Sequence, residues 1–375
     1  MKKIQMVDLQ SQYTKIKEAI DAGIQEVIDS ASFVKGQKVT DFQTHLEQYT
    51  GAKHVINVGN GTDALQIALM GLGLKPGDEV ITPTFTFIAT AEVVALLGLT
   101  PVVVDVEWET MNMDIASVRR AITPRTKAIV PVHLFGQCAN MEEIMAIANE
   151  HHLYVVEDAC QAIGAEYTFA NGETKQAGTM GHIGCTSFFP SKNLGCYGDG
   201  GAIFTNDDEL AARMRAIANH GMVIRYHHDM IGVNSRLDSI QAAVLDAKLP
   251  HLDEYIAARQ KAAAYYDKAF RGNGKLLIPG HEAHSTHVYH QYTLRVTGAD
   301  RDKLRTGLAE RGIPAMIYYP VPLHQQKAYL DPRYKDGDFP VAERLAGCVL
   351  SLPMHTELDE EQLAYITSNV LELIG

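Results

Sequence analysis

Long hydrophobic runs are missing from this 375-residue sequence. The longest candidate, residues 88–99, is interrupted by Thr90 and Glu92 and is far shorter than the roughly 18 to 20 apolar residues that span a bilayer. The first ten residues, MKKIQMVDLQ, lack the apolar core and the small-residue cleavage site of a secretion signal. We therefore expect a cytoplasmic protein that does not act in a membrane.

An excess of basic side chains is also missing. The chain carries 33 Lys and Arg residues against 45 Asp and Glu residues, a net charge of −12 at pH 7. Nucleic-acid binding relies on clustered Lys and Arg that neutralise phosphates, so this charge argues against a nucleic-acid partner. A phosphate-bearing small molecule can still bind through a local group of hydrogen-bond donors.

Paired cysteines are absent too. The sequence contains five cysteines, an odd number with no C-x-x-C pair, which indicates reduced and mostly buried thiols. The composition, 46% apolar and 21% charged, is typical of a globular enzyme. The length suits one large domain and one smaller domain.

Short β-branched runs alternate with helical stretches after a first predicted helix at residues 13–29. Near-continuous apolar strands joined by helices favour an α/β fold with a mainly parallel sheet, whose ligands bind at the carboxyl ends of the strands. The predicted strands are 54–58, 79–81, 102–104, 128–132, 153–156, 185–189 and 202–205. The predicted helices between them are 62–72, 86–97, 114–121, 141–151 and 207–219.

A second, smaller α+β unit is expected towards the C-terminus. A long helical pattern at 236–270 leads out of the first layer. Beyond it we predict strands at 289–296 and 315–319 and helices at 300–311 and 359–373. We therefore divide the chain into a large domain, residues 1–250 with the N-terminal helix, and a small domain, residues 251–375.

A glycine turn follows the first predicted strand. The run V-G-N-G-T-D-A-L, residues 58–65, passes from a strand through Gly59, Asn60 and Gly61 into a helix that begins with Thr62. Glycine permits close approach of an anion to the backbone, and the helix start attracts negative charge. Taken alone, such a turn is more often a plain connection.

An acidic residue ends a buried strand in the run V-V-E-D-A-C-Q-A, residues 155–162. Asp158 would hold a carboxylate in a poorly solvated place, where it must pair with a positive group or shift its pKa. The alternative for Asp158 alone is a helix N-cap.

A lysine follows another apolar strand in the run C-T-S-F-F-P-S-K-N-L-G, residues 185–195, ahead of G-D-G-G at 198–201. A partly desolvated lysine is a nucleophile that forms a Schiff base with a carbonyl, although a lone Ser-Lys pair is usually a surface feature. Together the turn, Asp158 and Lys192 supply what pyridoxal phosphate needs: an anion cradle, a carboxylate for the pyridinium nitrogen and an amine for the aldehyde.

The sequence resembles the DegT/DnrJ/EryC1/StrS family of sugar aminotransferases, which have the aspartate-aminotransferase fold (fold type I), over nearly its whole length. The resemblance rests on N-G-T-D-A-L, G-D-E-V-I-T-P (77–83), P-V-H-L-F-G (131–136), E-D-A-C-Q-A, S-F-F-P-S-K-N-L-G, G-D-G-G, G-V-N-S-R-L-D (232–238) and Y-P-V-P-L-H-Q-Q (319–326). It implies pyridoxal 5'-phosphate as the cofactor and no metal.

The resemblance also implies roles for single residues. Lys192 is expected to hold the cofactor covalently, Asp158 to contact its pyridine nitrogen and Gln161 to lie beside its ring hydroxyl. Phe87 is expected over the cofactor ring. The phosphate is expected to lie against Gly61, Thr62 and Ser187.

Two further implications concern assembly and reaction type. Asn234 matches a residue that reaches the phosphate of the neighbouring subunit, so the resemblance implies a homodimer with shared active sites. Relatives that dehydrate sugars carry histidine where this chain has Lys192, so transamination is favoured over dehydration.

The substrate prediction rests on the runs 187–210, 225–228 and 232–245, which are similar to one branch of the family. Enzymes of that branch aminate C3 of UDP-2-acetamido-2-deoxy-3-oxo-glucuronate for surface polysaccharides, with glutamate as donor. Arg236 is the candidate for a substrate carboxylate. Tyr319 and His324 are candidates for contact with the sugar or the donor. The chain departs from the family at Gln43 and Cys160.

Alternatives remain open. The same chemistry can act on a 4-keto-6-deoxy sugar linked to UDP or dTDP, and a non-catalytic regulator that binds the cofactor is a rival from another class. The histidines at 281, 284, 287 and 290 recur every three residues in an expected loop and strand, so they would not share one face as metal ligands do. His133 is open between a structural and a functional role.

Overall fold

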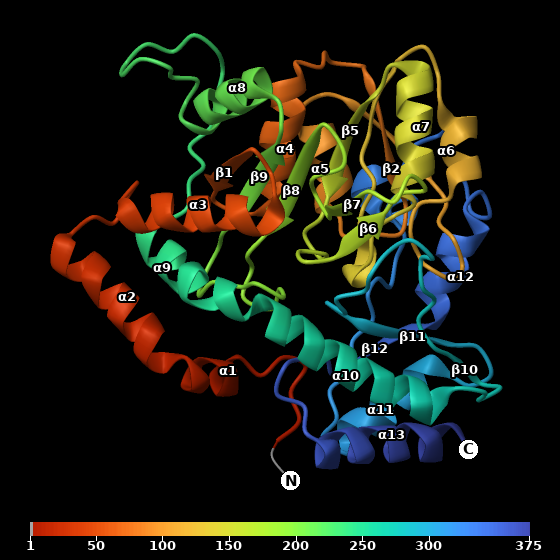
Figure 1. Ribbon diagram of the computed structural model, residues 1–375. Helices are drawn as coiled ribbons and strands as arrows, with labels where there is room; N and C mark the ends of the chain where they lie inside the picture. Colours follow the sequence, from red (N-terminus) through yellow and green to blue (C-terminus); the bar gives the residue numbers. More distant parts are fainter. Residues whose placement is uncertain (1–2) are drawn as a thin grey trace.

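The computed structural model describes residues 3–375, which form two units (Figure 1). The larger unit is built on a seven-stranded sheet in the order β1-β9-β8-β5-β4-β2-β3. Its strands are β1 (His54–Val58), β2 (Glu79–Pro83), β3 (Thr100–Val104), β4 (Thr126–Ile129), β5 (Tyr154–Asp158), β8 (Ile183–Ser187) and β9 (Gly201–Thr205).

The sheet is mainly parallel, as predicted. Strands β3, β2, β4, β5 and β8 pair in parallel, and β9 runs antiparallel to both β8 and β1. The carboxyl ends of β1, β5 and β8 therefore meet at one edge of the sheet. At this edge Asp158 is the register partner of Cys185, and Gly201 is the partner of both Ser187 and Val58.

Helices cover both faces of the sheet, because its strands are apolar on both sides. One core contains side chains of α3 (Gln37–Thr50), α7 (Met141–His151) and α9 (Ser239–Lys248). The other contains side chains of α4 (Gly61–Leu72), α5 (Ala89–Leu96) and α8 (Asp208–Ala218). The short helix α6 (Ile115–Ala121) packs beside α7.

The smaller unit has its own sheet and core. Its sheet has the order β10-β11-β12 and packs with three helices around Tyr266, Tyr292 and Leu350. The elements are β10 (Leu276–Leu277), β11 (Tyr292–Val296), β12 (Val349–Leu352), α10 (Leu252–Phe270), α11 (Arg301–Glu310) and α13 (Glu360–Ile374). Two further elements connect the units: the hairpin β6 (Glu166–Thr168) with β7 (Thr174–Gln176), and α12 (Pro340–Cys348). The proposed boundary at residue 250 falls between α9 and α10 and stays a prediction.

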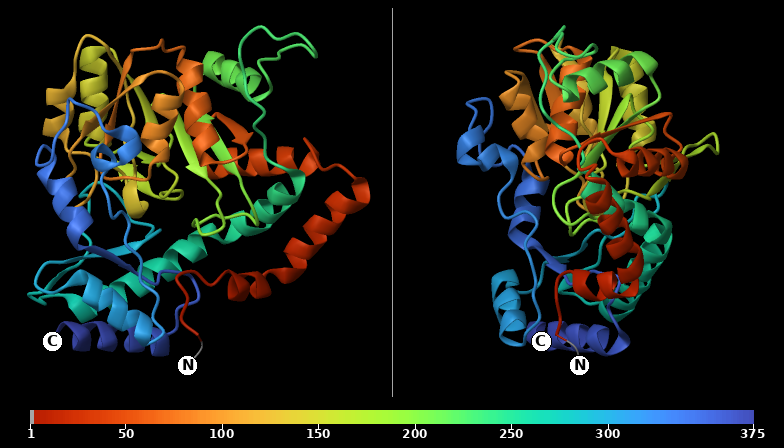
Figure 2. Two further views of the ribbon diagram at one scale, coloured as in Figure 1. Left: turned by 180° about the vertical axis from the view of Figure 1, so that it is seen from behind. Right: turned by 90° about the vertical axis from the view of Figure 1, so that its left-hand side faces the viewer.

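Two segments that we predicted as single long helices are each interrupted in the structure. The first becomes α1 (Leu9–Lys15) and α2 (Lys17–Ser30), with non-helical backbone at Ile16. Figure 2 shows these two helices, in red, reaching out to one side of the molecule. The second becomes α9 and α10, separated by a 3-10 turn that contains Pro250, which cannot donate the helical N–H bond.

The prediction of a strand at 315–319 is wrong. Only Met316 pairs with a neighbouring strand, in a single bridge to Ser351. Pro314 and Pro320 flank the segment, and proline cannot donate a bond to a sheet. The segment instead runs along the wall of a cavity. None of the helices within residues 3–375 is long and apolar enough to cross a membrane.

Candidate active site

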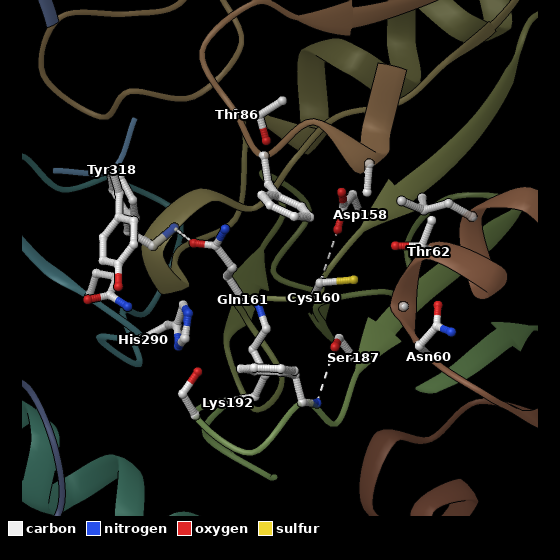
Figure 3. Close-up of a pocket in the computed structure, with 18 of the residues that line it drawn as sticks. Asn60, Thr62, Thr86, Asp158, Cys160, Gln161, Ser187, Lys192, His290 and Tyr318 are labelled. Atoms are coloured by element: carbon white, nitrogen blue, oxygen red, sulfur yellow. Dashed lines mark hydrogen bonds between the residues drawn. The ribbon is translucent and has the colours of Figure 1, made fainter. Parts of the chain in front are cut away.

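A cavity of about 610 Å³ opens at the carboxyl edge of the large sheet. Its walls come from the ends of β5 and β8, the start of α4, and two segments of the smaller unit around residues 290 and 318. Figure 3 shows Asp158, Gln161, Cys160 and Lys192 converging on the same space. The three features that the sequence singled out are thus brought together.

The glycine turn forms the N-terminus of α4 at one end of the cavity. The Asn60 side chain caps the helix by accepting a hydrogen bond from the Asp63 N–H at 2.8 Å. A Cβ added to Gly61 would lie 2.8 Å from both Cys160 Sγ and Ser187 Cβ, so only glycine lets the helix start approach β8 this closely. The first-turn N–H groups of a helix lack intrahelical partners, and the helix dipole attracts anions. This end of the cavity is suited to a phosphate.

Asp158 is held at the end of β5 by two donors. Its Oδ2 accepts from the Thr90 hydroxyl at 2.8 Å, and its Oδ1 accepts from the Cys160 N–H at 3.2 Å. Asp158 caps no helix among the described elements, so the N-cap interpretation is wrong. Its buried carboxylate is available to a cationic group in the cavity.

Lys192 lies in the loop after β8, and its side chain enters the cavity. Its backbone N–H bonds to the Phe189 carbonyl at 2.9 Å, and the side chain of the next residue, Asn193, donates to the Val288 carbonyl at 2.9 Å. Burial lowers the pKa of the Lys192 amine, while nearby Cys160 and Asp158 oppose that shift. A lowered pKa leaves more of the amine uncharged and nucleophilic.

Aromatic and amide groups form the opposite wall. Gln161 accepts from the Phe135 N–H at 2.9 Å and donates to the Tyr319 hydroxyl at 3.2 Å. The Phe87 ring lies 6.2 Å from that of Tyr319 and is 53% exposed in this single chain. Its open face can cover a planar ligand.

Two other predicted residues, Asn234 and Arg236, lie outside this cavity. Both line a hollow of about 490 Å³ with Gln43 and a smaller one of about 240 Å³. The smaller hollow shares Asp199 with the main cavity, and Arg236 is ion-paired with Asp238 there. The structure therefore places these two side chains beside the cavity and not in it.

His324 is a third predicted contact that lies outside the cavity. It is buried, and its ring nitrogens bond to the Thr84 hydroxyl at 2.8 Å and to Glu343 at 3.2 Å. Its ring packs 4.6 Å from that of Phe339. These contacts indicate a structural role for His324 between the two units.

The contacts of His133 also indicate a structural role. It is fully buried, and its Nε2 lies 2.8 Å from Glu157 Oε2. Its Nδ1 accepts from the Ala139 N–H at 3.1 Å. Both ring nitrogens are satisfied away from the cavity, which supports the structural alternative.

Sequence reasoning missed several residues of the cavity wall. His290 and Tyr318 come from the smaller unit, and Phe189 lies next to the recognised lysine loop. Of the four evenly spaced histidines, His290 faces the cavity, while His287 stacks on Tyr289 with ring centres 3.9 Å apart. Local motifs carry no signal for such contacts, because folding joins segments about 100 residues apart. Within residues 3–375 no group of side chains is arranged to hold a metal ion.

The residues of the cavity fit pyridoxal phosphate. The start of α4 offers an anion cradle that a Cβ would fill, and the buried Thr86 hydroxyl in the wall has no hydrogen-bond partner within the described chain. Asp158 and Lys192 offer the carboxylate and the amine that the cofactor's ring nitrogen and aldehyde require.

Comparison with known proteins identifies the relatives of this chain. Residues 14–371 match the DegT/DnrJ/EryC1/StrS aminotransferase family. The chain is 49% identical over 363 residues to the UDP-2-acetamido-2-deoxy-3-oxo-D-glucuronate aminotransferase of Pseudomonas aeruginosa, covering 97% of this chain and 98% of the relative. It is 48% identical over 371 residues to a pleiotropic regulatory protein of Geobacillus stearothermophilus, covering 98% of each.

Solved structures agree with this assignment. DesV of S. venezuelae, solved with a ketimine intermediate, matches with a TM-score of 0.94 and 40% identity over 99% of this chain and 98% of that one. A family aminotransferase from Brucella abortus matches with a TM-score of 0.92 and 40% identity over 99% of this chain and 100% of that one. The chain therefore belongs to the DegT/DnrJ/EryC1/StrS family of pyridoxal-phosphate-dependent aminotransferases, with the fold of type I.

Proposed function

We propose that this enzyme transfers an amino group from glutamate to C3 of UDP-2-acetamido-2-deoxy-3-oxo-glucuronate, a step towards surface polysaccharide. The convergence of the Lys192 amine, the Asp158 carboxylate and the α4 N-terminus in one cavity carries the amine-transfer part of the proposal. The substrate part is supported by the P. aeruginosa relative, which matches over nearly the whole of both chains.

Lys192 and Asp158 are proposed as the catalytic residues. Bound pyridoxal phosphate supplies an electron sink for the negative charge that develops at a substrate carbon. Lys192 Nζ would hold the cofactor covalently and, once released, would act as the general base that takes the proton from the donor's α-carbon and then as the general acid that returns it. The Asp158 carboxylate, oriented by Thr90 and Cys160, would stabilise a positive charge on the ring nitrogen of the bound cofactor.

Five further residues are proposed to bind the cofactor. Gly61 and Thr62 at the α4 start and Ser187 at the end of β8 hold the phosphate. Gln161, fixed by Phe135, lies beside the ring hydroxyl. Phe87 covers the ring with its exposed face.

Amino transfer takes place in two half-reactions through the same lysine, so we expect ping-pong kinetics. The donor leaves as a keto acid before the keto-sugar binds. Lysine at 192, in place of the histidine of dehydrating relatives, favours this reaction over dehydration.

We also propose a homodimer with shared active sites. Asn234 lies outside its own cavity, as expected of a residue that reaches the phosphate of a neighbouring subunit. The loop before it, prominent at the upper left of Figure 1, exposes apolar side chains that suit a protein partner: Val223, Ile224, Tyr226 and Ile231.

Substrate contacts follow from this arrangement. The Tyr319 hydroxyl lies in the cavity wall, where it can contact the sugar or the donor. Arg236 is proposed to bind the substrate carboxylate from beside the cavity, after exchange of its present partner Asp238. For His324 the structure supports no direct contact, and we propose no role for it in substrate binding.

The experiment that tests the function is incubation with glutamate and a panel of UDP- and dTDP-linked keto-sugars, followed by mass analysis of the products. We expect an amino sugar from the 3-oxo-glucuronate. Amination of 4-keto-6-deoxy sugars alone would replace the proposed substrate with the alternative one.

A regulator that binds the cofactor without catalysis is the second candidate, because a relative at 48% identity is named as a regulatory protein. Glutamate should change the visible absorbance of the cofactor in an aminotransferase, whereas a non-catalytic binder should show no change. We further propose a cytoplasmic location, which the five free cysteines support, since thiols stay reduced there.

A further inference from the structure

His290 is a polar side chain in the cavity wall that none of the roles above uses. It is 7% exposed, yet its Nδ1 is buried without a hydrogen-bond partner in the described chain. A buried polar group usually finds a partner, so an unpaired one in a binding cavity points to a partner that arrives during function.

The backbone around His290 is held in place from several sides. The fully buried Arg259 on α10 donates to the carbonyls of Tyr289 at 3.1 Å and Met354 at 3.0 Å. Gly136 allows the chain to pass close to this segment, since a Cβ at Gly136 would lie 2.9 Å from the backbone nitrogen of His290. Tyr289 has a left-handed backbone conformation, with φ at 48°. The imidazole is therefore presented from a fixed segment.

This segment is tied directly to the lysine loop. Asn193, the neighbour of Lys192, bonds through its side chain to the Val288 carbonyl, two residues before His290. In Figure 3 the Lys192 side chain rises between His290 on one side and Cys160 on the other. A hydrogen bond thus joins the two segments that carry these side chains.

The surroundings of the imidazole favour its neutral form. Burial, with further contributions from Lys192 and Arg259, holds the pKa of His290 well below its usual value. A neutral imidazole always has one nitrogen with a lone pair, which accepts a hydrogen bond. Its neighbour Lys192 has N–H groups to donate.

We propose that His290 is a positioning residue that accepts a hydrogen bond from the Lys192 amine whenever that amine is released from the cofactor. This inference rests on the proposed function. A free amine has two N–H bonds and one lone pair, and it rotates about its Cε–Nζ bond. Donation of one N–H to His290 restricts this rotation and aims the lone pair at the carbon whose proton is transferred. Misdirected groups in active sites lose rate by factors of roughly 10 to 100.

The first measurement uses protein without cofactor. The pH dependence of Lys192 acylation, followed by mass spectrometry, reports its pKa in the wild type, His290→Phe and His290→Asn. In His290→Phe the protonated amine of Lys192 loses a hydrogen-bond acceptor. Because this destabilises the charged form, we expect the pKa of Lys192 to fall. The Asn carbonyl restores an acceptor and should restore the pKa. Asp158 and Cys160, which also face Lys192, are unchanged in all three proteins.

The second measurement is the half-reaction with glutamate, followed by cofactor absorbance. We expect His290→Phe to slow the rate roughly 10- to 100-fold with little change in the glutamate KM, and His290→Asn to recover most of it. His284→Asn, on the exposed part of the same segment, is the matched control and should behave as wild type.

Three results would overturn the inference: an unchanged Lys192 pKa, an unchanged rate in His290→Phe, or a raised substrate KM at an unchanged rate. The last result would make His290 a substrate contact. If His290→Phe does not fold, His290→Leu removes the same lone pair in a smaller side chain. If wild-type protein shows no glutamate half-reaction, the proposed function fails, while the pKa measurement still decides the contact between His290 and Lys192.

Discussion

Lys192 shows how much of a residue's chemistry comes from its surroundings. An exposed lysine is almost fully protonated at neutral pH and is a poor nucleophile. Burial in the cavity lowers the pKa of Lys192, although Asp158 and Cys160 partly oppose this. The shift is useful only because the loop also aims the side chain into the cavity.

Replacement of Lys192 by Ala should abolish steady turnover. The variant loses both the covalent attachment and the group that moves the proton, so we expect a loss of about 10³-fold or more. Lys127→Ala removes an exposed lysine far from the cavity and serves as the control. Product formation by mass analysis is the measurement. Steady turnover of Lys192→Ala without added amine would disprove its catalytic role, whereas partial rescue by a small amine would support it.

His133 illustrates a polar residue whose role is stability. Glu157 is buried next to Asp158 and accepts N–H bonds from Gly178 at 2.8 Å and Met180 at 2.7 Å. His133→Leu would leave the Ala139 N–H unpaired and would remove one of the two donors to Glu157 Oε2, which keeps the Gly178 N–H. Each buried group left unpaired costs about 1–3 kcal/mol.

We therefore expect His133→Leu to lower the free energy of unfolding by about 1–3 kcal/mol in urea titrations. Cofactor affinity per folded molecule should change little, because His133 does not touch the cavity. His284→Leu, at an exposed histidine, is the control. A variant as stable as the wild type but with impaired half-reactions would return His133 to the functional alternative.

At the scale of elements, the position of the α4 N-terminus depends on Gly61, which has no side chain. Gly61 brings the helix against the end of β8, within van der Waals reach of Cys160 and Ser187. Gly61→Ala should push α4 away from β8 and weaken the affinity for pyridoxal phosphate by about 10-fold, a loss of ~1.4 kcal/mol. Titration of apoprotein with cofactor, followed by absorbance, is the measurement.

The matched test of this explanation is the double variant Gly61→Ala/Cys160→Ala. It removes one of the two close contacts, that with Cys160 Sγ, and leaves the one with Ser187 Cβ. We expect partial recovery of affinity relative to Gly61→Ala, with Cys160→Ala alone close to wild type. If the double variant shows no recovery, the clash with Cys160 is not the cause of the loss.

Elements were predictable where one local signal dominated. The strands of the large sheet and their helices carry continuous apolar runs, and the predicted strand at 54–58 agrees with β1. The strand β12 lies in the run V-L-S-L, which a short sequence window does not separate from its helical neighbours. The break between α9 and α10 has a local signal in Pro250, which the spacing of apolar residues alone does not report.

The candidate site also contains residues that the sequence predicted and residues that it did not. Asp158 ends β5 and Lys192 lies in the loop after β8, so the rule that ligands bind at strand ends finds them. His290 and Tyr318 reach the cavity only because the smaller unit folds back onto the sheet. His324 has a similar motif context, but it packs between Thr84 and Phe339 and not into the cavity.

At the scale of the whole molecule, the cavity is shaped by both units, and its surroundings are open on the side of Asn234. Asp199 borders both the cavity and the hollow that contains Asn234 and Arg236. A second subunit that covers this side would complete the site and bury the exposed apolar loop. Shared active sites make a definite prediction for mixed dimers.

Two inactive variants should restore activity when their subunits mix. In a dimer of Lys192→Ala with Asn234→Asp, one site combines an intact Lys192 with the partner's intact Asn234. Asn234→Asp should be inactive by itself, because its carboxylate would repel the cofactor phosphate. Random mixing gives about half mixed dimers with one good site each, so about one quarter of wild-type activity is expected.

The control pairs Lys192→Ala with Asp158→Asn. Both residues lie in the same chain's cavity, so no mixed dimer regains a complete site and activity should stay near background. Mass measurement of the intact assemblies establishes that mixed dimers form in both cases. If they form and neither pair regains activity, Asn234 acts within its own subunit or has no part in cofactor binding, and the proposal of shared sites is wrong.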